Sequence, residues 1–217
     1  MRLYSYFRSS ASFRVRIALA LKKLDFEYAA VQLVKNEQLQ PSFRAIAASQ
    51  LVPALVVDDP AHGEATLTQS LAIIEYLDET FPEPPLLPAD ALGRARVRAI
   101  ALDIACEIHP LDNLRVLRYL QRELKVSDDD KDRWYRHWVE TGLDVVERGL
   151  AGHPATGRFC HGDRPGLADC VLVPQIFNAQ RMKCRLDHVP TVMRIFDACM
   201  AEPAFAQAQP SACPDAA

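Results

Sequence analysis

The sequence predicts an α/β domain at the N-terminus followed by an all-helical domain. Over residues 1–82, segments that alternate like strands are interleaved with segments whose apolar residues recur at helical spacing. Residues 83–89 are rich in proline, which is typical of a linker. Over residues 90–217, the apolar patterns have helical spacing and none has the quality of a strand. We therefore expect two domains, 1–82 and 90–217, joined by the linker 83–89.

In the first domain, the patterns predict strands at 2–7, 26–33, 52–57 and 65–68, and helices at 12–24, 41–48 and 70–81. Ser12 and Ser70 are candidate N-caps for the first and last of these helices. A strand–helix–strand start requires a right-handed crossover between parallel strands, and the two later strands, adjacent in sequence, imply an antiparallel pair. A small mixed sheet with helices on both faces satisfies both requirements.

In the second domain, helical spacing predicts helices at 93–108, 112–124, 129–150, 167–180 and 191–200. Gly166 stands where the fourth of these helices would be capped, and glycine is a poorer N-cap than serine or threonine but is permitted. The tail from Pro203 is rich in Ala, Gln and Pro, and we expect it to be loosely packed.

The composition excludes several classes of function. Lys plus Arg is 25 and Asp plus Glu is 28, giving a formal net charge of −3, whereas nucleic-acid binders usually carry a basic excess. The N-terminus lacks the apolar core of a signal peptide, and no apolar run is long enough to cross a membrane. The six cysteines form no CxxC pair and the six histidines show no metal-binding spacing. We expect a cytoplasmic protein with reduced thiols and no metal.

Residues 8–14 form the most distinctive segment, because they lie between the first predicted strand and the first predicted helix. The N–H groups at a helix N-terminus point outward with positive partial charge and stabilise an anion. Ser9, Ser10 and Ser12 add hydroxyl donors, and Arg8 and Arg14 add positive charge. A thiol bound here would ionise more easily, as cysteines do at helix N-termini. From the residues alone, a serine-rich helix cap without a ligand is an equally good interpretation.

Five motifs along the chain favour the ligand-binding interpretation. They are Ser-Ser-Ala-Ser-Phe-Arg-Val-Arg-Ile-Ala-Leu at 9–19, Leu-Val-Pro-Ala-Leu at 51–55, Thr-Gln-Ser-Leu-Ala-Ile-Ile-Glu-Tyr-Leu at 68–77, Ile-His-Pro-Leu-Asp-Asn-Leu at 108–114, and Gly162-Asp163 with Leu167-Ala168-Asp169 and Leu172-Val173-Pro174-Gln175. Together they resemble the motifs of zeta-class glutathione transferases, the class of maleylacetoacetate and maleylpyruvate isomerases. The resemblance implies the glutathione transferase architecture, which is an α/β thioredoxin-like N-terminal domain plus an all-α C-terminal domain, and a homodimer.

The resemblance also implies a cofactor, glutathione, and roles for its site residues. The hydroxyl of Ser9 or Ser10 would stabilise the glutathione thiolate, and we favour Ser9. The backbone of Val52, exposed by a cis peptide bond to Pro53, would pair with the cofactor as an added strand does. Gln69 and Ser70 would hold its γ-glutamyl carboxylate. The full set of implied glutathione-binding residues is Ser9, Ser10, Ala11, Ser12, Phe13, Arg14, Gln38, Val52, Pro53, Gln69, Ser70, His109, Asn113, Leu114 and Arg115.

The chain departs from the class at Ala11, where the class usually has cysteine. This removes a thiol beside the site and any step that depends on it. The thiolate is stabilised by serine in this hypothesis, so we expect catalysis to survive.

The implied reaction is the glutathione-dependent cis–trans isomerisation of maleylacetoacetate, in the breakdown of tyrosine and phenylalanine. Its substrate is a small dianionic keto acid, and arginine matches carboxylates in bidentate geometry. Arg8, Arg115 and Arg181 fall where related enzymes place groups near the substrate, although surface arginines are also common without any such role. Three alternatives remain: maleylpyruvate isomerisation in the gentisate pathway, a detoxifying transferase acting on α-haloacids or electrophiles, and a non-catalytic binding protein.

Overall fold

The computed structural model describes residues 1–216. Contacts divide the chain into two compact units, Met1–Leu86 with residues 201–216, and Leu87–Met200. The boundary between Leu86 and Leu87 falls within the proline-rich segment 83–89. Within the described part of the chain, no helix is both long and apolar enough to span a bilayer.

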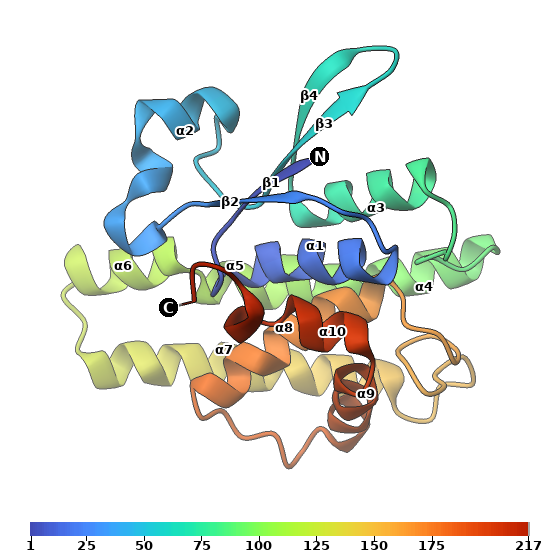
Figure 1. Ribbon diagram of the computed structural model, residues 1–217. Helices are drawn as coiled ribbons and strands as arrows, with labels where there is room; N and C mark the ends of the chain where they lie inside the picture. The colour runs from blue at the N-terminus through green and yellow to red at the C-terminus, as the bar shows by residue number, and fades with distance from the viewer. Residues whose placement is uncertain (217) are drawn as a thin grey trace. The chain divides into compact units, whose positions relative to one another are not determined.

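The first unit is built on a four-stranded mixed sheet in the order β2-β1-β3-β4 (Figure 1). The strands are β1 (Arg2–Ser5), β2 (Glu27–Ala30), β3 (Ala54–Asp59) and β4 (Gly63–Thr68). β1 pairs in parallel with β2, and the β1–β3 and β3–β4 pairs are antiparallel. The structure thus confirms the predicted mixed sheet.

Helices cover the two faces of this sheet. α1 (Ser10–Leu21) and α3 (Ser70–Thr80) lie side by side on one face, above the fully buried pair Leu3 and Leu55 (Figure 1). α2 (Pro41–Ile46) packs on the other face, where the ring of Phe43 meets that of Tyr4 edge-on at 6.0 Å. Since side chains alternate between faces along a strand, the neighbouring residues Leu3 and Tyr4 of β1 pack on opposite faces of the sheet.

The predicted N-caps of α1 and α3 were each misplaced. α1 begins at Ser10, and its cap is Ser9, whose hydroxyl accepts a hydrogen bond from the Ser12 N–H at 3.2 Å. Ser12 was predicted as the cap, but the turn closed by the Ser9 N–H and the Tyr6 carbonyl at 2.9 Å already leads the chain into the helix. Likewise Ser70 is the first residue of α3, and Gln69 occupies the cap position.

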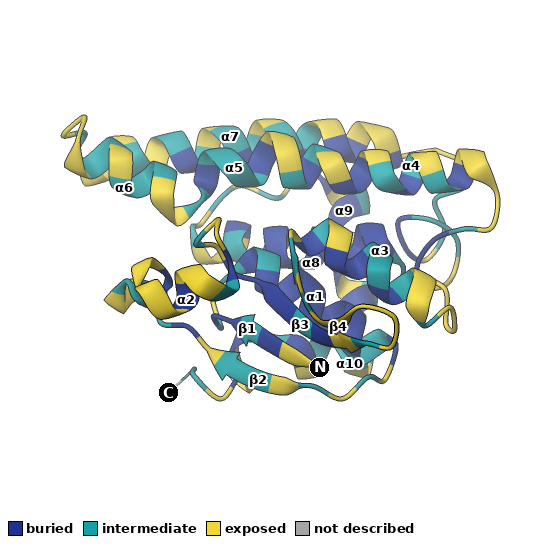
Figure 2. Ribbon diagram, turned by 90° about the horizontal axis from the view of Figure 1, so that it is seen from above, coloured by how far each residue is buried: buried dark blue, intermediate teal, exposed yellow. Residues whose placement is uncertain are grey.

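The second unit is all-helical. Its elements are α4 (Ala91–Leu102), a π-helix (Asp103–Ile108), α5 (His109–Asp112), α6 (Leu114–Arg122), α7 (Asp128–Leu150), α8 (Leu167–Arg181) and α9 (Pro190–Met200). α8 is buried along most of its length (Figure 2). Its cap is Gly166, as predicted, and the Asp169 carboxylate accepts hydrogen bonds from the N–H groups of Gly166 and Cys160 at 2.8 and 2.9 Å. The Asp169 carboxylate thereby satisfies the N–H of the cap residue, which is the reciprocal half of a capping box, and ties the start of α8 to Cys160.

The C-terminal tail differs from our expectation. It was predicted to be loosely packed and to belong to the helical domain. Instead it forms α10 (Pro203–Ala208), which packs against α1 in the first unit (Figure 2). Phe205 is fully buried there and anchors the helix. Hydrophobic burial therefore returns the end of the chain to the unit that contains its beginning.

Candidate functional site

One edge of the sheet brings together three segments that the sequence analysis singled out. In the register of the sheet, Tyr4 is paired with Ala54, and Ala54 with Thr68. The end of β1, the start of β3 and the end of β4 therefore meet at the same edge. Residues 6–9, 52–53 and 69–70 lie directly beyond these strand ends, and the N-termini of α1 and α3 follow the first and third of them.

Ser9 is the hydroxyl best placed to meet a ligand at this edge. Its oxygen already accepts from the Ser12 N–H, so its own proton can be donated away from the helix. Ser9 is half-buried, whereas Ser10 is 5% exposed and Ser12 is fully buried. The geometry favours Ser9 over Ser10 as a donor to a bound anion.

The segment Val52–Pro53 leads into β3 at this edge of the sheet. Its peptide bond is cis, as the resemblance implied. The ladder between β3 and β4 starts at Ala54, so Val52 lies just outside the paired part of the strand. An extended ligand can pair with such backbone groups in the way that an added strand does.

Ser70 and Arg14 form the cationic part of the edge. The Arg14 Nη1 group donates a hydrogen bond to the Ser70 hydroxyl oxygen at 3.2 Å. Arg14 is 2% exposed, and its guanidinium group lies at the N-terminal end of α3, where the helix dipole is also positive. A carboxylate bound at Gln69 and Ser70 would meet both charges.

Gln69 has an unusual backbone. Its φ of 69° and ψ of 116° lie in a region that residues with a side chain rarely adopt. Such a conformation costs about 1–3 kcal/mol and persists only where the surroundings enforce it. This strained residue joins β4 to α3 at the edge of the sheet.

The other predicted residues of the first unit contribute differently. Gln38 lies on a 3₁₀ turn before α2 and is 8% exposed, and its Oε1 atom has no hydrogen-bond partner among residues 1–216. Phe13 is 2% exposed, with its ring 5.2 Å from the Arg16 guanidinium, so it can reach a ligand only through its backbone. Ala11 is half-buried on the first turn of α1, and Arg8 is exposed over the Phe7 ring.

The remaining predicted residues lie in the second unit. His109 begins α5, and Asn113 caps α6 by accepting from the Val116 N–H at 3.2 Å and donating to the Pro110 carbonyl at 2.9 Å. The Asn113 side chain is thus engaged in local structure. Leu114 and Arg115 are exposed on the first turn of α6.

A buried carboxyl group, Asp112, was missed by the sequence analysis. It lies near Tyr135, which is itself hydrogen-bonded to Arg181 at the end of α8. Asp112 is 7% exposed, and neither of its oxygens has a hydrogen-bond partner in the described chain. Burial raises the pKa of Asp112 to about 8. Asp112 stands at the start of the helix predicted over 112–124, and no feature of the sequence marks it as buried.

As a whole, the edge of the first unit can hold an extended molecule with an anionic group at each end. Ser9 and the α1 N-terminus would stabilise one anion, while Ser70, Arg14 and the α3 N-terminus would stabilise the other. No group of three or more His, Cys, Asp or Glu side chains in the described chain is arranged to hold a metal ion.

Comparison with known proteins gives matches over nearly the whole chain. Residues 1–79 match the N-terminal domain of glutathione S-transferases and residues 131–207 match the C-terminal domain. A relative from Vibrio cholerae described as a probable maleylacetoacetate isomerase is 48% identical over 99% of this chain and 97% of its own.

Solved structures agree with these matches. The holo structure of a maleylpyruvate isomerase, described as a bacterial zeta-class glutathione S-transferase, has a TM-score of 0.94 and 45% identity, covering 100% of both chains. A maleylacetoacetate isomerase from Anaeromyxobacter dehalogenans, with dicarboxyethyl glutathione and citrate in its active site, has a TM-score of 0.89 and 44% identity, covering 100% of this chain and 97% of its own.

The strained backbone of Gln69 leads to a stability prediction. In the Gln69→Gly variant the strain is relieved, and glycine adds back only about 0.5–1 kcal/mol of chain entropy. We expect the free energy of unfolding in urea to rise by about 1 kcal/mol. Gln32→Gly is the matched control because Gln32 has a φ of −76° and no such strain. A loss of stability in Gln69→Gly as large as in the control would contradict the prediction.

The raised pKa of Asp112 leads to a prediction about pH. The folded protein keeps this proton up to about pH 8, whereas the unfolded chain releases it near pH 4, so the group lowers stability as pH rises between these values. Asp112→Asn removes this dependence. We compare the free energy of unfolding of the variant with that of the wild type at each pH. We expect the difference, variant minus wild type, to increase by about 1–3 kcal/mol from pH 5 to pH 8.

The exposed Asp187, changed to Asn, serves as the control for this measurement. If Asp112→Asn and Asp187→Asn show the same pH dependence as the wild type, Asp112 is ionised in the folded protein and the prediction is wrong.

Proposed function

Since the chain belongs to the glutathione S-transferase family and to its zeta class, we propose that it is a glutathione-dependent cis–trans isomerase that converts maleylacetoacetate to fumarylacetoacetate. The observation that carries this proposal is the edge of the sheet, where Ser9, Val52 and Ser70 lie just beyond three aligned strand ends. Their chemistry matches the thiol, the peptide backbone and the γ-glutamyl carboxylate of glutathione.

In this proposal, Ser70, Gln69 and Arg14 bind the γ-glutamyl carboxylate. Arg14 is buried and held against the Ser70 hydroxyl, so its charge acts in a medium of low dielectric constant, where it is stronger than in water. The backbone of Val52 aligns the cysteinyl part of the tripeptide. With the molecule anchored at these points, its sulfur is directed toward Ser9.

Ser9 and the first turn of α1 then lower the pKa of the bound thiol. The Ser9 hydroxyl would donate a hydrogen bond to the sulfur, and the N-terminal end of the helix dipole adds positive potential. Bound glutathione would supply a thiolate that adds reversibly to the substrate's double bond, permits rotation about the single bond so formed, and leaves again as the double bond is restored. Because Ala11 stands where the class usually has cysteine, the protein's hydroxyl and backbone groups carry this activation.

Positive side chains are our candidates for the two substrate carboxylates. Arg8 directly precedes Ser9 in the first unit and is exposed, while Arg115 and Arg181 are exposed in the second unit. Guanidinium groups bind carboxylates through paired hydrogen bonds. His109, Asn113 and Leu114 are lesser candidates, since Asn113 is already engaged as a helix cap.

Maleylpyruvate isomerisation is the second candidate reaction. The related enzyme of that name is 45% identical over its full length, and the maleylacetoacetate isomerases compared above are 44% and 48% identical. The two substrates differ by a short carbon spacer, and pockets discriminate poorly at that scale.

We also propose a setting for this activity. None of the six cysteines, all of which lie within residues 1–216, forms a disulfide, which is consistent with a reducing compartment such as the cytoplasm. A homodimer and a place in aromatic amino-acid breakdown follow from the class to which the chain belongs.

A substrate comparison tests the proposed function. Purified protein with glutathione is given maleylacetoacetate or maleylpyruvate, and loss of each cis compound is followed. We expect turnover of maleylacetoacetate with the higher kcat/KM, and none without glutathione. Turnover of maleylpyruvate alone would select the second candidate. If neither compound is converted, the isomerase proposal is wrong.

The roles of the two serines are tested separately. Ser9→Ala removes the hydroxyl that donates to the sulfur, and we expect kcat to fall by about 10²-fold or more, as for other donors that stabilise a reacting anion. Ser10→Ala changes a buried helix residue, and we expect less than about a fivefold loss. Equal rates for Ser9→Ala and the wild type would refute our account of thiol activation.

A further inference from the structure

The turn that presents Ser9 is held by groups far away in the sequence. It is closed by a hydrogen bond from the Ser9 N–H to the Tyr6 carbonyl at 2.9 Å. Phe7, inside the turn, has both of its backbone groups engaged. Its N–H donates to the Asp215 carboxylate at 3.2 Å, and its carbonyl accepts from the Arg16 Nη2 group at 3.1 Å.

Asp215 belongs to the end of the chain, 208 residues from Phe7. Its other carboxylate oxygen accepts a hydrogen bond from the Tyr28 hydroxyl at 2.6 Å. Tyr28 lies on β2, where it is paired with Leu3 of β1. The carboxylate therefore links a strand of the sheet to the turn that follows the neighbouring strand.

Arg16 holds the other side of the same turn. It is 3% exposed, and its remaining nitrogens donate to the Ser5 hydroxyl at 3.1 Å and to the Ala208 carbonyl at 2.9 Å. Burial is the main influence on its pKa and lowers it, while the nearby charge of Asp215 raises it. One guanidinium group thus connects β1, the turn and the C-terminal helix.

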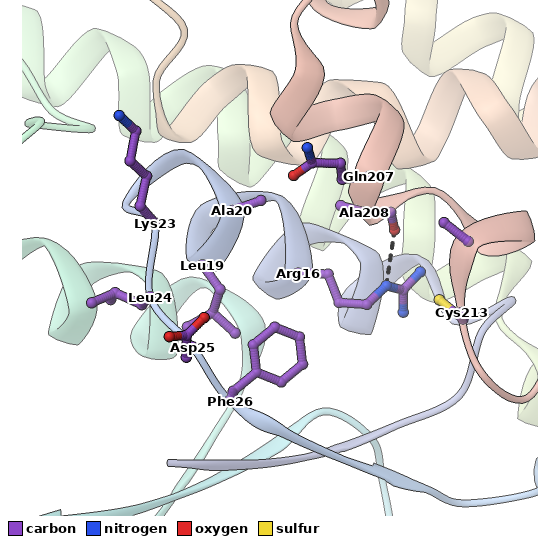
Figure 3. A pocket seen from close by; sticks show the side chains of 11 residues that line it. Arg16, Leu19, Ala20, Lys23, Leu24, Asp25, Phe26, Gln207, Ala208 and Cys213 are labelled. Atoms are coloured by element: carbon purple, nitrogen blue, oxygen red, sulfur yellow. Dashed lines mark hydrogen bonds between the residues drawn. The ribbon is translucent and has the colours of Figure 1, made fainter.

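The polar contacts of Arg16 lie beside a cavity between α1 and the C-terminal segment. Arg16, Ala208 and Cys213 line a cavity of about 370 Å³ between α1 and the tail, with Arg16 bonded to the Ala208 carbonyl (Figure 3). Phe205 anchors α10 by burial, and the hydrogen bonds of Arg16 and Asp215 add polar attachments at Ala208 and beyond the helix.

We propose that Asp215 is a positioning residue for the Ser9 hydroxyl, so that the C-terminus of the chain takes part in the reaction by clamping the turn Tyr6–Ser9. The proposal rests on the function proposed above. Phe7 is two residues before Ser9, and rotation of its peptide groups moves the Ser9 side chain directly. Rates of reaction are sensitive to displacements of about 1 Å in such groups.

The test compares full-length variants in two independent measurements. Asp215→Ala removes the clamp. Asp215→Asn keeps an acceptor for the Phe7 N–H and gains an amide that can donate to the Tyr28 oxygen. Asp58→Ala removes an exposed carboxylate from β3 of the same unit and serves as the control. The measurements are amide hydrogen exchange over residues 7–12 without ligand, and kcat and KM for glutathione.

We expect Asp215→Ala to exchange faster at residues 7–12 and to lose about 5–20-fold in kcat, with KM for glutathione within about twofold of the wild type. The contacts that anchor glutathione at Val52 and Ser70 are not touched by the change. Asp215→Asn should recover most of the rate, and Asp58→Ala should match the wild type. A role in overall stability alone would instead raise exchange throughout the chain and leave kcat of the folded enzyme unchanged.

Unchanged exchange and kcat in Asp215→Ala would overturn the proposal. If that variant does not fold, Tyr28→Phe, which frees one oxygen of Asp215, should produce the same changes to a smaller extent, and wild-type behaviour there would overturn it. Faster exchange at residues 7–12 in Asp215→Ala, together with a wild type that converts neither substrate, would reject the proposed function and leave the clamp of the turn standing.

Discussion

The pairing of β3 with both β1 and β4 is the constraint on which the candidate site depends. Ala54 is opposite Tyr4 on one side and Thr68 on the other, so three strand ends are level at one edge of the sheet. A shift of one residue in either pairing would turn every side chain to the opposite face and move the loops out of line. Leu3 and Leu55, fully buried together, oppose such a shift. Hydrophobic burial beneath the sheet therefore sets the spacing of the polar groups at its edge.

The same edge has a positive electrostatic potential although the protein as a whole is not basic. The chain has a net charge of −3, yet two helix N-termini and the buried Arg14 meet where the strands end. Dipoles and a desolvated guanidinium act strongly at short range, and their local field does not depend on the overall charge. The strained backbone of Gln69 belongs to this arrangement, since it turns the chain from β4 into α3 at the point where an anion would bind.

Local patterns in the sequence predicted most of the fold. Alternation and helical spacing identified the mixed sheet and the helices of both units apart from α10, because those periods reflect which faces are buried. The cap of α1 was misplaced because Ser9, Ser10 and Ser12 are equivalent as sequence signals, and only the turn after β1 distinguishes them. The packing of the tail, the burial of Asp112 and the contact between Phe7 and Asp215 depend on distant parts of the chain, and no local period encodes them.

The central claim is that the edge of the sheet ionises a bound thiol. Its most direct test is the ultraviolet absorbance of the thiolate, followed against pH for glutathione bound to the wild-type protein. We expect the bound thiol to ionise with a pKa at least about one unit below that of free glutathione, as thiols do at helix N-termini. If bound and free glutathione ionise at the same pH, Ser9 and the first turn of α1 do not activate the thiol and the account is contradicted.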